Sequence, residues 1–75
     1  MTKDTILLQD LANAVKKKRK ELGFTQEKLS AISGVGIRFL VELESGEKET
    51  LQIGKVQQVL KRLGLSFQIS ERNKK

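Results

Sequence analysis

The sequence predicts an all-α fold, a small four-helix bundle, with one β-strand at its C-terminal end. Three observations support this prediction. Apolar residues recur at helical spacing in four segments, and a glycine follows each of these segments. After Gly64, strict alternation of apolar and polar residues replaces the helical spacing. The 75 residues are expected to form one domain over residues 1–75.

The first helix is expected at about residues 7–22 and is expected to end at Gly23. Glycine adopts the left-handed backbone conformation of a C-terminal cap, and Phe24 beyond it is expected to fold back onto the helix end. Four apolar side chains fall near one face of this helix: Leu8, Leu11, Val15 and Leu22. This face is expected to lie in the core.

A basic run, KKKRK at residues 16–20, lies inside the first predicted helix and allows two interpretations. The run can be a solvated face, with cations placed near the C-terminal end where the helix dipole favours them. It can also form part of a surface that contacts phosphates. Five consecutive residues cover all sides of a helix, so they cannot all face one partner.

Two short helices are predicted next, at residues 26–33 and 37–45, joined by a tight turn. Thr25 stands where an N-cap belongs, because its hydroxyl can accept a hydrogen bond from a free backbone N–H. Gly34 is expected to end the first of these helices, and Val35 is expected to fill the corner between them.

The second short helix is expected to begin at Gly36 and to end at Gly46. Leu40 and Leu43 form a buried i, i+3 stripe on it. The side chains expected to face outward are Ile37, Arg38, Val41 and Glu42. A pair of helices joined in this way is typical of a helix-turn-helix that reads DNA, although a helical hairpin that only packs has the same pattern.

The fourth helix is expected to run from near Gly54 to Gly64, with Leu51 and Ile53 packed under its start. Its apolar positions are Ile53, Val56, Val59, Leu60 and Leu63. After it, Leu65, Phe67 and Ile69 alternate with polar residues, which predicts one half-buried strand at about residues 65–70.

This strand has no second strand in the chain to pair with, so its expected partner is the same strand of another copy, in a two-fold homodimer. A chain of 75 residues without cysteine also lacks disulfides to support a small core, which favours oligomerisation. The polar tail, residues 71–75, is expected to be disordered.

The charge points to nucleic acid as the first partner to consider. The formal net charge is +6, and the isoelectric point is about 9.9, so the chain should be attracted to polyanions. Without His or Cys, the commonest catalytic base and metal ligands are absent, so no enzyme activity, metal or cofactor is expected. No apolar run approaches the ~20 residues that span a bilayer, and a soluble cytoplasmic protein is expected.

Two other binding functions remain as alternatives. A cationic adaptor could add its strand to the sheet of a partner protein and have only nonspecific affinity for DNA. RNA binding usually relies on exposed aromatic side chains that stack on bases. The chain has three Phe and neither Tyr nor Trp, which argues against RNA.

Residues 25–46 resemble the helix-turn-helix of the phage-repressor (Xre) family, which implies a lambda-repressor-like fold. The matching residues are Thr25, Gln26, Leu29, Ser30, Gly34, Val35, Leu40, Glu44 and Gly46. The resemblance implies a structural ion pair between Arg19 and Glu44. It also implies backbone-phosphate contacts, here assigned to Thr25, Gln26, Lys28 and Lys48, although Lys48 can equally be an ordinary loop lysine.

Base contacts are expected from the exposed start of the second short helix. Arg38 is the strongest candidate, because bidentate Arg to guanine is the commonest specific contact, although Arg38 can instead hold a phosphate. Ile37 is expected to contact a thymine methyl, and Glu42 to accept from a cytosine amino group or to repel wrong registers. The family usually has Ser or Thr at position 36, and polar residues are frequent at positions 37 and 39. Gly36, Ile37 and Phe39 depart from that pattern, so sequence preference does not transfer from relatives.

The segment LANAVKKKRKELGFTQEKL, followed by the later helix and strand, is similar to the HipB family of antitoxins over about residues 11–69. This resemblance implies a dimeric repressor that binds palindromic operators of its own operon. It also implies a HipA-like serine/threonine kinase toxin as a partner. A plain phage-type repressor without a toxin partner is the alternative.

Overall fold

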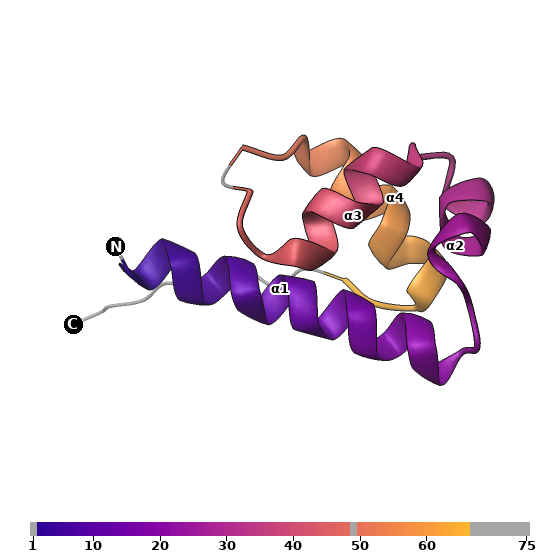
Figure 1. Ribbon diagram of the computed structural model, residues 1–75, viewed down its shortest axis with the longest axis horizontal. Coiled ribbons are helices and arrows are strands. Elements are labelled where there is room, and N and C mark those ends of the chain that lie inside the picture. Colours follow the sequence, from indigo (N-terminus) through magenta and orange to yellow (C-terminus); the bar gives the residue numbers. More distant parts are fainter. Residues whose placement is uncertain (1, 49, 67–75) are drawn as a thin grey trace.

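Four α-helices make up the computed structural model, which describes the backbone of residues 2–48 and 50–66 and the side chains of residues 8–48 and 50–66. The helices are α1 (Thr2–Glu21), α2 (Gln26–Ser33), α3 (Ile37–Ser45) and α4 (Ile53–Leu63). In Figure 1, α1 runs along the bottom of the molecule and the three shorter helices lie above it. Both α1 and α2 pack against α3 and against α4.

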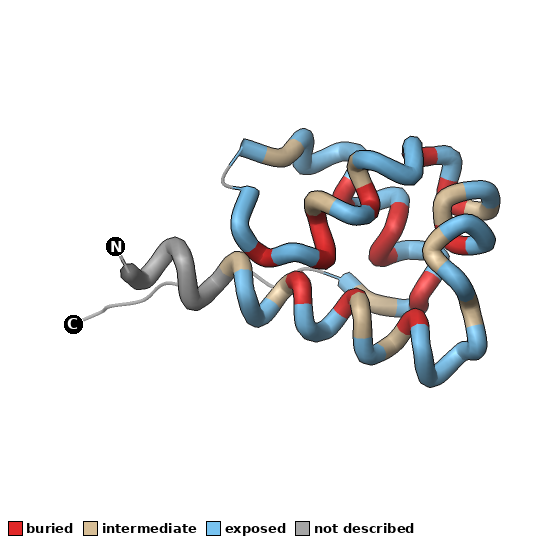
Figure 2. The backbone as a smooth tube through the Cα atoms, in the orientation of Figure 1, coloured by how far each residue is buried: buried red, intermediate tan, exposed pale blue. Residues whose placement is uncertain are grey.

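The core consists of aliphatic side chains that lie between the helices. Figure 2 shows buried positions on the sides of the helices that face one another. The buried cluster contains Val15, Leu29, Val35, Leu40, Leu43, Val56, Val59, Leu60 and Leu63. Every helix contributes to this cluster, so each helix depends on the others to bury its apolar face.

α1 ends in a Schellman cap at Gly23, whose φ is +78°. Gly23 N–H donates to the Lys20 carbonyl, and Phe24 N–H donates to the Arg19 carbonyl, both at 3.0 Å. Phe24 is partly buried against the core, as the sequence predicts. Leu22 is 46% exposed, so the prediction that it lies on the core face is wrong. Gly23 turns the chain away from the helix axis directly after Leu22.

The observed helix bounds agree with the predicted ones to within one residue, except at the start of α1. α1 begins at Thr2 rather than near residue 7, because its first residues lack apolar periodicity but contain no helix breaker. α4 begins at Ile53. The prediction that Ile53 packs under the start of this helix is wrong, since its side chain is 60% exposed on a first turn that extends past the core. Leu51 does pack against the core, as predicted.

The predicted C-terminal strand falls mostly outside the described residues. Phe67, Ile69 and the tail 71–75 all lie there. Within residues 2–48 and 50–66 the structure has no strand, and Leu65 instead closes α4. Its N–H donates to the Leu60 carbonyl at 2.9 Å, and its side chain packs partly buried against the core.

Gly46 ends α3 close to α1, and its replacement tests how tightly the two helices pack. A Cβ at Gly46 would lie 3.3 Å from the Ala12 Cβ and 3.5 Å from the Gln9 Cα, whereas a Cβ at Gly23 would meet nothing within 4 Å. Both glycines have φ above +70°, so alanine strains the backbone by about 1–2 kcal/mol at either position.

We therefore expect Gly46→Ala to lower the unfolding free energy by about 1 kcal/mol more than Gly23→Ala does. Urea unfolding followed by circular dichroism at 222 nm measures both losses. Equal losses for the two variants would show that α1 yields to the added methyl without cost.

Candidate nucleic-acid interface

α2 begins at Thr25, whose side chain caps the helix. Thr25 Oγ1 accepts a hydrogen bond from the backbone N–H of Lys28 at 3.0 Å. The reciprocal half of a capping box requires Glu or Gln at position 28, where this chain has lysine. α2 ends at Gly34, which has φ +80° and donates its N–H to the Ser30 carbonyl. The bounds of α2 are those that the sequence predicts.

Removal of the cap should destabilise the fold modestly. We expect Thr25→Ala to lower the unfolding free energy by about 1 kcal/mol, because a backbone N–H at the start of α2 loses its acceptor. Thr25→Ser keeps the hydroxyl and is the matched control, so its thermal unfolding midpoint should stay near that of wild type. Equal midpoints for the alanine and serine variants would contradict the capping role.

The turn between α2 and α3 is held at Val35. The Val35 side chain is 4% exposed, and its carbonyl accepts a hydrogen bond from Ser30 Oγ at 2.6 Å. The sequence predicts the buried valine but not this bond. The serine inside a short helix is the only signal for it, since such hydroxyls commonly bond to nearby backbone. The turn therefore fixes the angle at which α3 leaves α2.

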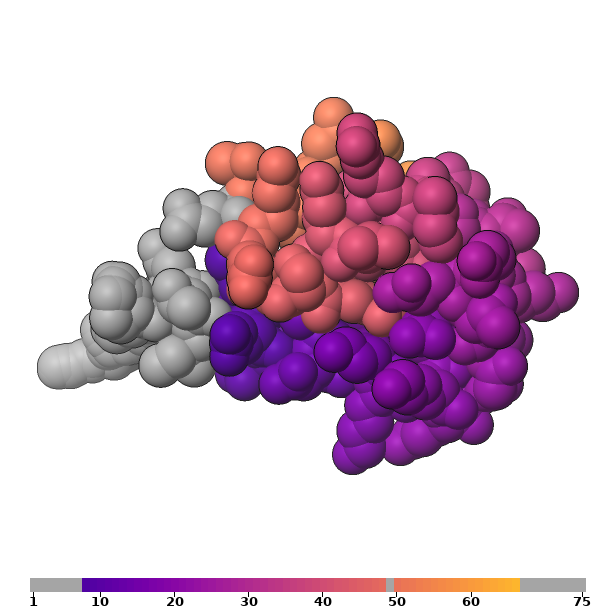
Figure 3. All heavy atoms as spheres, in the orientation of Figure 1, coloured from indigo at the N-terminus to yellow at the C-terminus, as the bar shows by residue number. Residues whose placement is uncertain are grey.

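α3 buries one face and exposes the other. Leu40 and Leu43 are 0% and 2% exposed, while Ile37 and Val41 are 43% and 47% exposed. Arg38 is also exposed. In Figure 3, α3 lies in the middle of the face shown, between α2 on the right and the segment that follows α3. The outward face of α3 thus exposes two apolar side chains and one guanidinium to solvent.

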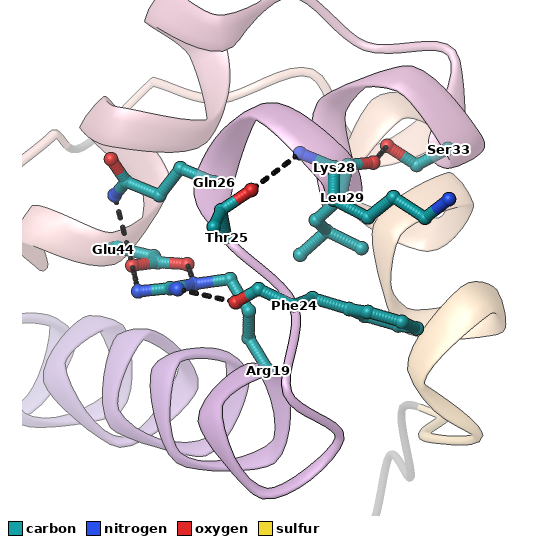
Figure 4. Close-up of polar contacts among 8 residues, drawn as sticks. All are labelled: Arg19, Phe24, Thr25, Gln26, Lys28, Leu29, Ser33 and Glu44. Atoms are coloured by element: carbon teal, nitrogen blue, oxygen red, sulfur yellow. Dashed lines mark hydrogen bonds and ion pairs between the residues drawn. The ribbon is translucent and has the colours of Figure 1, made fainter.

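Arg19 and Glu44 form a buried bidentate ion pair beneath α3. Arg19 Nε lies 2.7 Å from Glu44 Oε2, and Arg19 Nη2 lies 3.0 Å from Glu44 Oε1. The two side chains are only 11% and 4% exposed. Arg19 Nη1 also donates to the Phe24 carbonyl at 2.8 Å. Figure 4 shows the guanidinium reaching from α1 to the carboxylate on α3, so the pair joins the ends of these helices.

Gln26 adds a third hydrogen bond to the same carboxylate. Its Nε2 donates to Glu44 Oε1 at 3.1 Å, on the side of Glu44 away from Arg19 in Figure 4. The sequence assigns Gln26 to a phosphate and does not predict this bond. An amide has two N–H donors, so Gln26 still has one donor for a phosphate. Every buried side-chain N or O atom in the described part of the chain has a partner.

The other charged candidates lie on several different segments of the fold. Lys48 Nζ lies 3.9 Å from Glu42 Oε2, and the two side chains are 48% and 38% exposed. An ion pair this exposed to solvent is weak. It places Lys48, a predicted phosphate contact, beside Glu42, a predicted base contact. Lys28 is exposed on α2. Lys55 Nζ lies 5.7 Å from the centroid of the Phe39 ring, a contact that the sequence pattern does not reveal.

The basic run of α1 is distributed around the helix. Arg19 is buried, Lys17 and Lys20 are exposed, and Lys16 and Lys18 are intermediate. Lys18 Nζ pairs with Glu21 across one turn at 3.7 Å. Only part of this run can therefore face any one partner, as the sequence suggests.

The described residues contain no group of three or more Asp or Glu side chains placed to hold a metal ion. No helix within the described ranges has the length and apolar character needed to cross a membrane. The candidate site therefore consists of the exposed faces of α2 and α3 together with the buried Arg19–Glu44 ion pair.

Comparison with known proteins agrees with this geometry. The pattern of the helix-turn-helix family matches residues 15–69, which include α2, α3 and α4. Over 60 residues the chain is 50% identical to an uncharacterized HTH-type transcriptional regulator, y4mF, of Sinorhizobium fredii. That match covers 80% of this chain and 78% of the relative. The chain therefore belongs to the Xre-type helix-turn-helix family of DNA-binding transcription regulators.

Proposed function

We propose that this protein is a sequence-specific transcriptional repressor that places α3 in the major groove of operator DNA. The exposed face of α3, braced from below by the buried Arg19–Glu44 pair, is the observation that supports this most. A helix fixed in this way carries its side chains to base edges in a set geometry, as major-groove reading requires. The net charge of +6 supports attraction to the phosphate backbone.

The roles of the side chains divide between positioning and reading. Phosphate contacts fix the register of a protein on DNA, and base contacts select the sequence. We assign phosphate contacts to Thr25, Gln26, Lys28 and Lys48. We assign base reading to Ile37, Arg38 and Glu42, with Arg38 directed at guanine.

We propose that the repressor acts as a homodimer on a near-palindromic operator of its own gene. The alternating pattern that starts at Leu65 supports pairing across a two-fold axis. Each copy would read one half-site, with the half-sites about one helical turn apart or a multiple of it. Light scattering should give the mass of two chains for wild type and of one chain for Phe67→Glu. A wild-type mass of one chain at micromolar concentration would remove the dimer from the proposal.

An antitoxin role is the finer form of this proposal. It is supported by the similarity of residues 11–69 to HipB-type antitoxins, and it gives the protein a HipA-like serine/threonine kinase as a partner. A kinase-like reading frame beside this gene, whose product co-purifies with the protein, is the expected result. Its absence leaves a plain repressor.

The experiment that tests the repressor function is a titration of two labelled duplexes at physiological salt. One duplex covers the region upstream of the gene, and the other has the same composition in shuffled order. A preference for the native duplex of about a thousandfold or more supports an operator-reading repressor. Equal, weak binding to both duplexes would reduce the interaction to charge and favour the adaptor function.

A further inference from the structure

α3 carries an apolar stripe on the surface that it presents to solvent. Ile37 and Val41 are 43% and 47% exposed, and their i, i+4 spacing places them one above the other on the same side of the helix. On the opposite side of α3, Leu40 and Leu43 belong to the core. Ile37 and Val41 lie outside the core cluster, so packing in the core does not explain why branched aliphatic residues occupy these two positions.

Two cationic side chains lie on α3 or against it. Arg38 follows Ile37 and is exposed, and the Lys55 ammonium lies over the Phe39 ring at 5.7 Å from its centroid. Glu42 is the acidic residue of this face, and Lys48 lies within 3.9 Å of it. An apolar stripe on a helix with cationic side chains fits a partner that has both methyl groups and negative charge. The major groove of DNA offers thymine methyls between two rows of phosphates.

We infer that Ile37 and Val41 together read the C5-methyl groups of two thymines in the major groove. Apolar side chains distinguish thymine there because its methyl group is the one apolar feature of the four base edges. The inference rests on the proposed function and extends it from Ile37 alone to a pair of residues. It defines the preferred half-site by its methyl groups.

The spacing of the two side chains predicts the spacing of the two thymines. Four residues of α-helix rise about 6 Å, which is nearly two base steps of about 3.4 Å. For a helix that lies along the groove, the two thymines are therefore two base steps apart, on the same strand or on opposite strands. Both strands expose their thymine methyls in the major groove.

The test removes the methyl groups from the DNA. The native duplex is compared with the same duplex in which deoxyuridine replaces every thymine, so that only the C5-methyl groups are lost. Wild type should bind the uracil duplex about fourfold more weakly for each methyl contacted, or about 15-fold for two. A third duplex, in which 5-methylcytosine replaces cytosine, carries the same methyl group on the other pyrimidine and should bind as the native duplex does.

Three variants locate the effect on α3. Ile37→Ala with Val41→Ala should bind the thymine and uracil duplexes with equal affinity, which also controls for any change in DNA shape caused by uracil. Leu22→Ala removes a side chain of similar exposure, 46%, at the end of α1. This variant should keep the full sensitivity to uracil that wild type shows.

The outcomes separate this inference from the function on which it rests. If wild type prefers the native duplex over the shuffled one but binds the thymine and uracil duplexes equally, the repressor stands and the methyl reading is overturned. The methyl reading is also overturned if the double variant remains as sensitive to uracil as wild type. If wild type binds the 5-methylcytosine duplex more tightly than the native one and binds the uracil duplex equally well, the assignment to thymine is overturned. If wild type prefers no duplex, the proposed function itself fails.

Discussion

Replacement of Glu44 by alanine is expected to lower the free energy of unfolding by about 3–5 kcal/mol. The change leaves the Arg19 guanidinium buried without its counter-ion, and it also removes the acceptor of the Gln26 amide. A domain of this size has little stability in reserve, so the variant should be partly unfolded at physiological temperature. Urea unfolding followed by circular dichroism measures the loss.

Two further variants test the physical reason for that loss. Lys18→Ala breaks the exposed pair with Glu21, in which the side chains are 40% and 50% exposed, and should change stability by about 0.5 kcal/mol or less. Arg19→Met combined with Glu44→Leu removes both charges and should recover much of the stability lost in Glu44→Ala. If Glu44→Ala were as mild as Lys18→Ala, the Arg19–Glu44 pair would not brace α3.

Replacement of Arg38 by alanine is expected to give the largest loss of DNA discrimination. A bidentate Arg–guanine contact discriminates by about 1–3 kcal/mol, so the native-to-shuffled affinity ratio should fall by about 5- to 150-fold. Stability should hardly change, because Arg38 is exposed and makes no hydrogen bond or ion pair within the described part of the chain. Fluorescence anisotropy titrations of both duplexes measure the ratio.

Arg62→Ala is the matched control for Arg38. It removes the same side chain and the same charge from an exposed position in the last turn of α4. The variant should weaken binding to both duplexes and leave the native-to-shuffled affinity ratio unchanged. Arg38→Lys keeps the charge but loses the planar fork, so it should recover affinity more than discrimination. Equal weakening of both duplexes by Arg38→Ala would assign Arg38 to phosphate instead.

The sequence predicts α2 and α3 with the bounds that the structure gives. Strong local signals explain this accuracy, because Thr25 and Gly34 mark the ends of α2, and the glycines 36 and 46 flank α3. The start of α1 has no such signal, so the sequence pattern places it about five residues too late. Ile53 has helical spacing, but spacing does not reveal where the core ends, and its side chain is exposed.

Within the candidate site, the sequence predicts which residues of α3 face outward but not how the charged groups pair. The Arg19–Glu44 pair is implied by the resemblance to the Xre family and not by spacing, because 25 residues separate the two in sequence. The Gln26–Glu44 bond depends on how α2 packs against α3. That arrangement is a property of the packed core and leaves no periodic pattern in the sequence.

α2 and α3 differ in how their first turns are capped, and amide hydrogen exchange should report this difference. α2 starts with the Thr25 hydroxyl bound to a backbone N–H, whereas α3 starts at Gly36 with no capping bond from any side chain that the structure describes. The amides of residues 37–39 have no side-chain acceptor, so they are expected to exchange with solvent more readily than the capped amide of Lys28 in α2. Reading of DNA would then begin at the most adaptable turn of an otherwise braced helix, and protection of these amides on binding would report how far that turn becomes ordered.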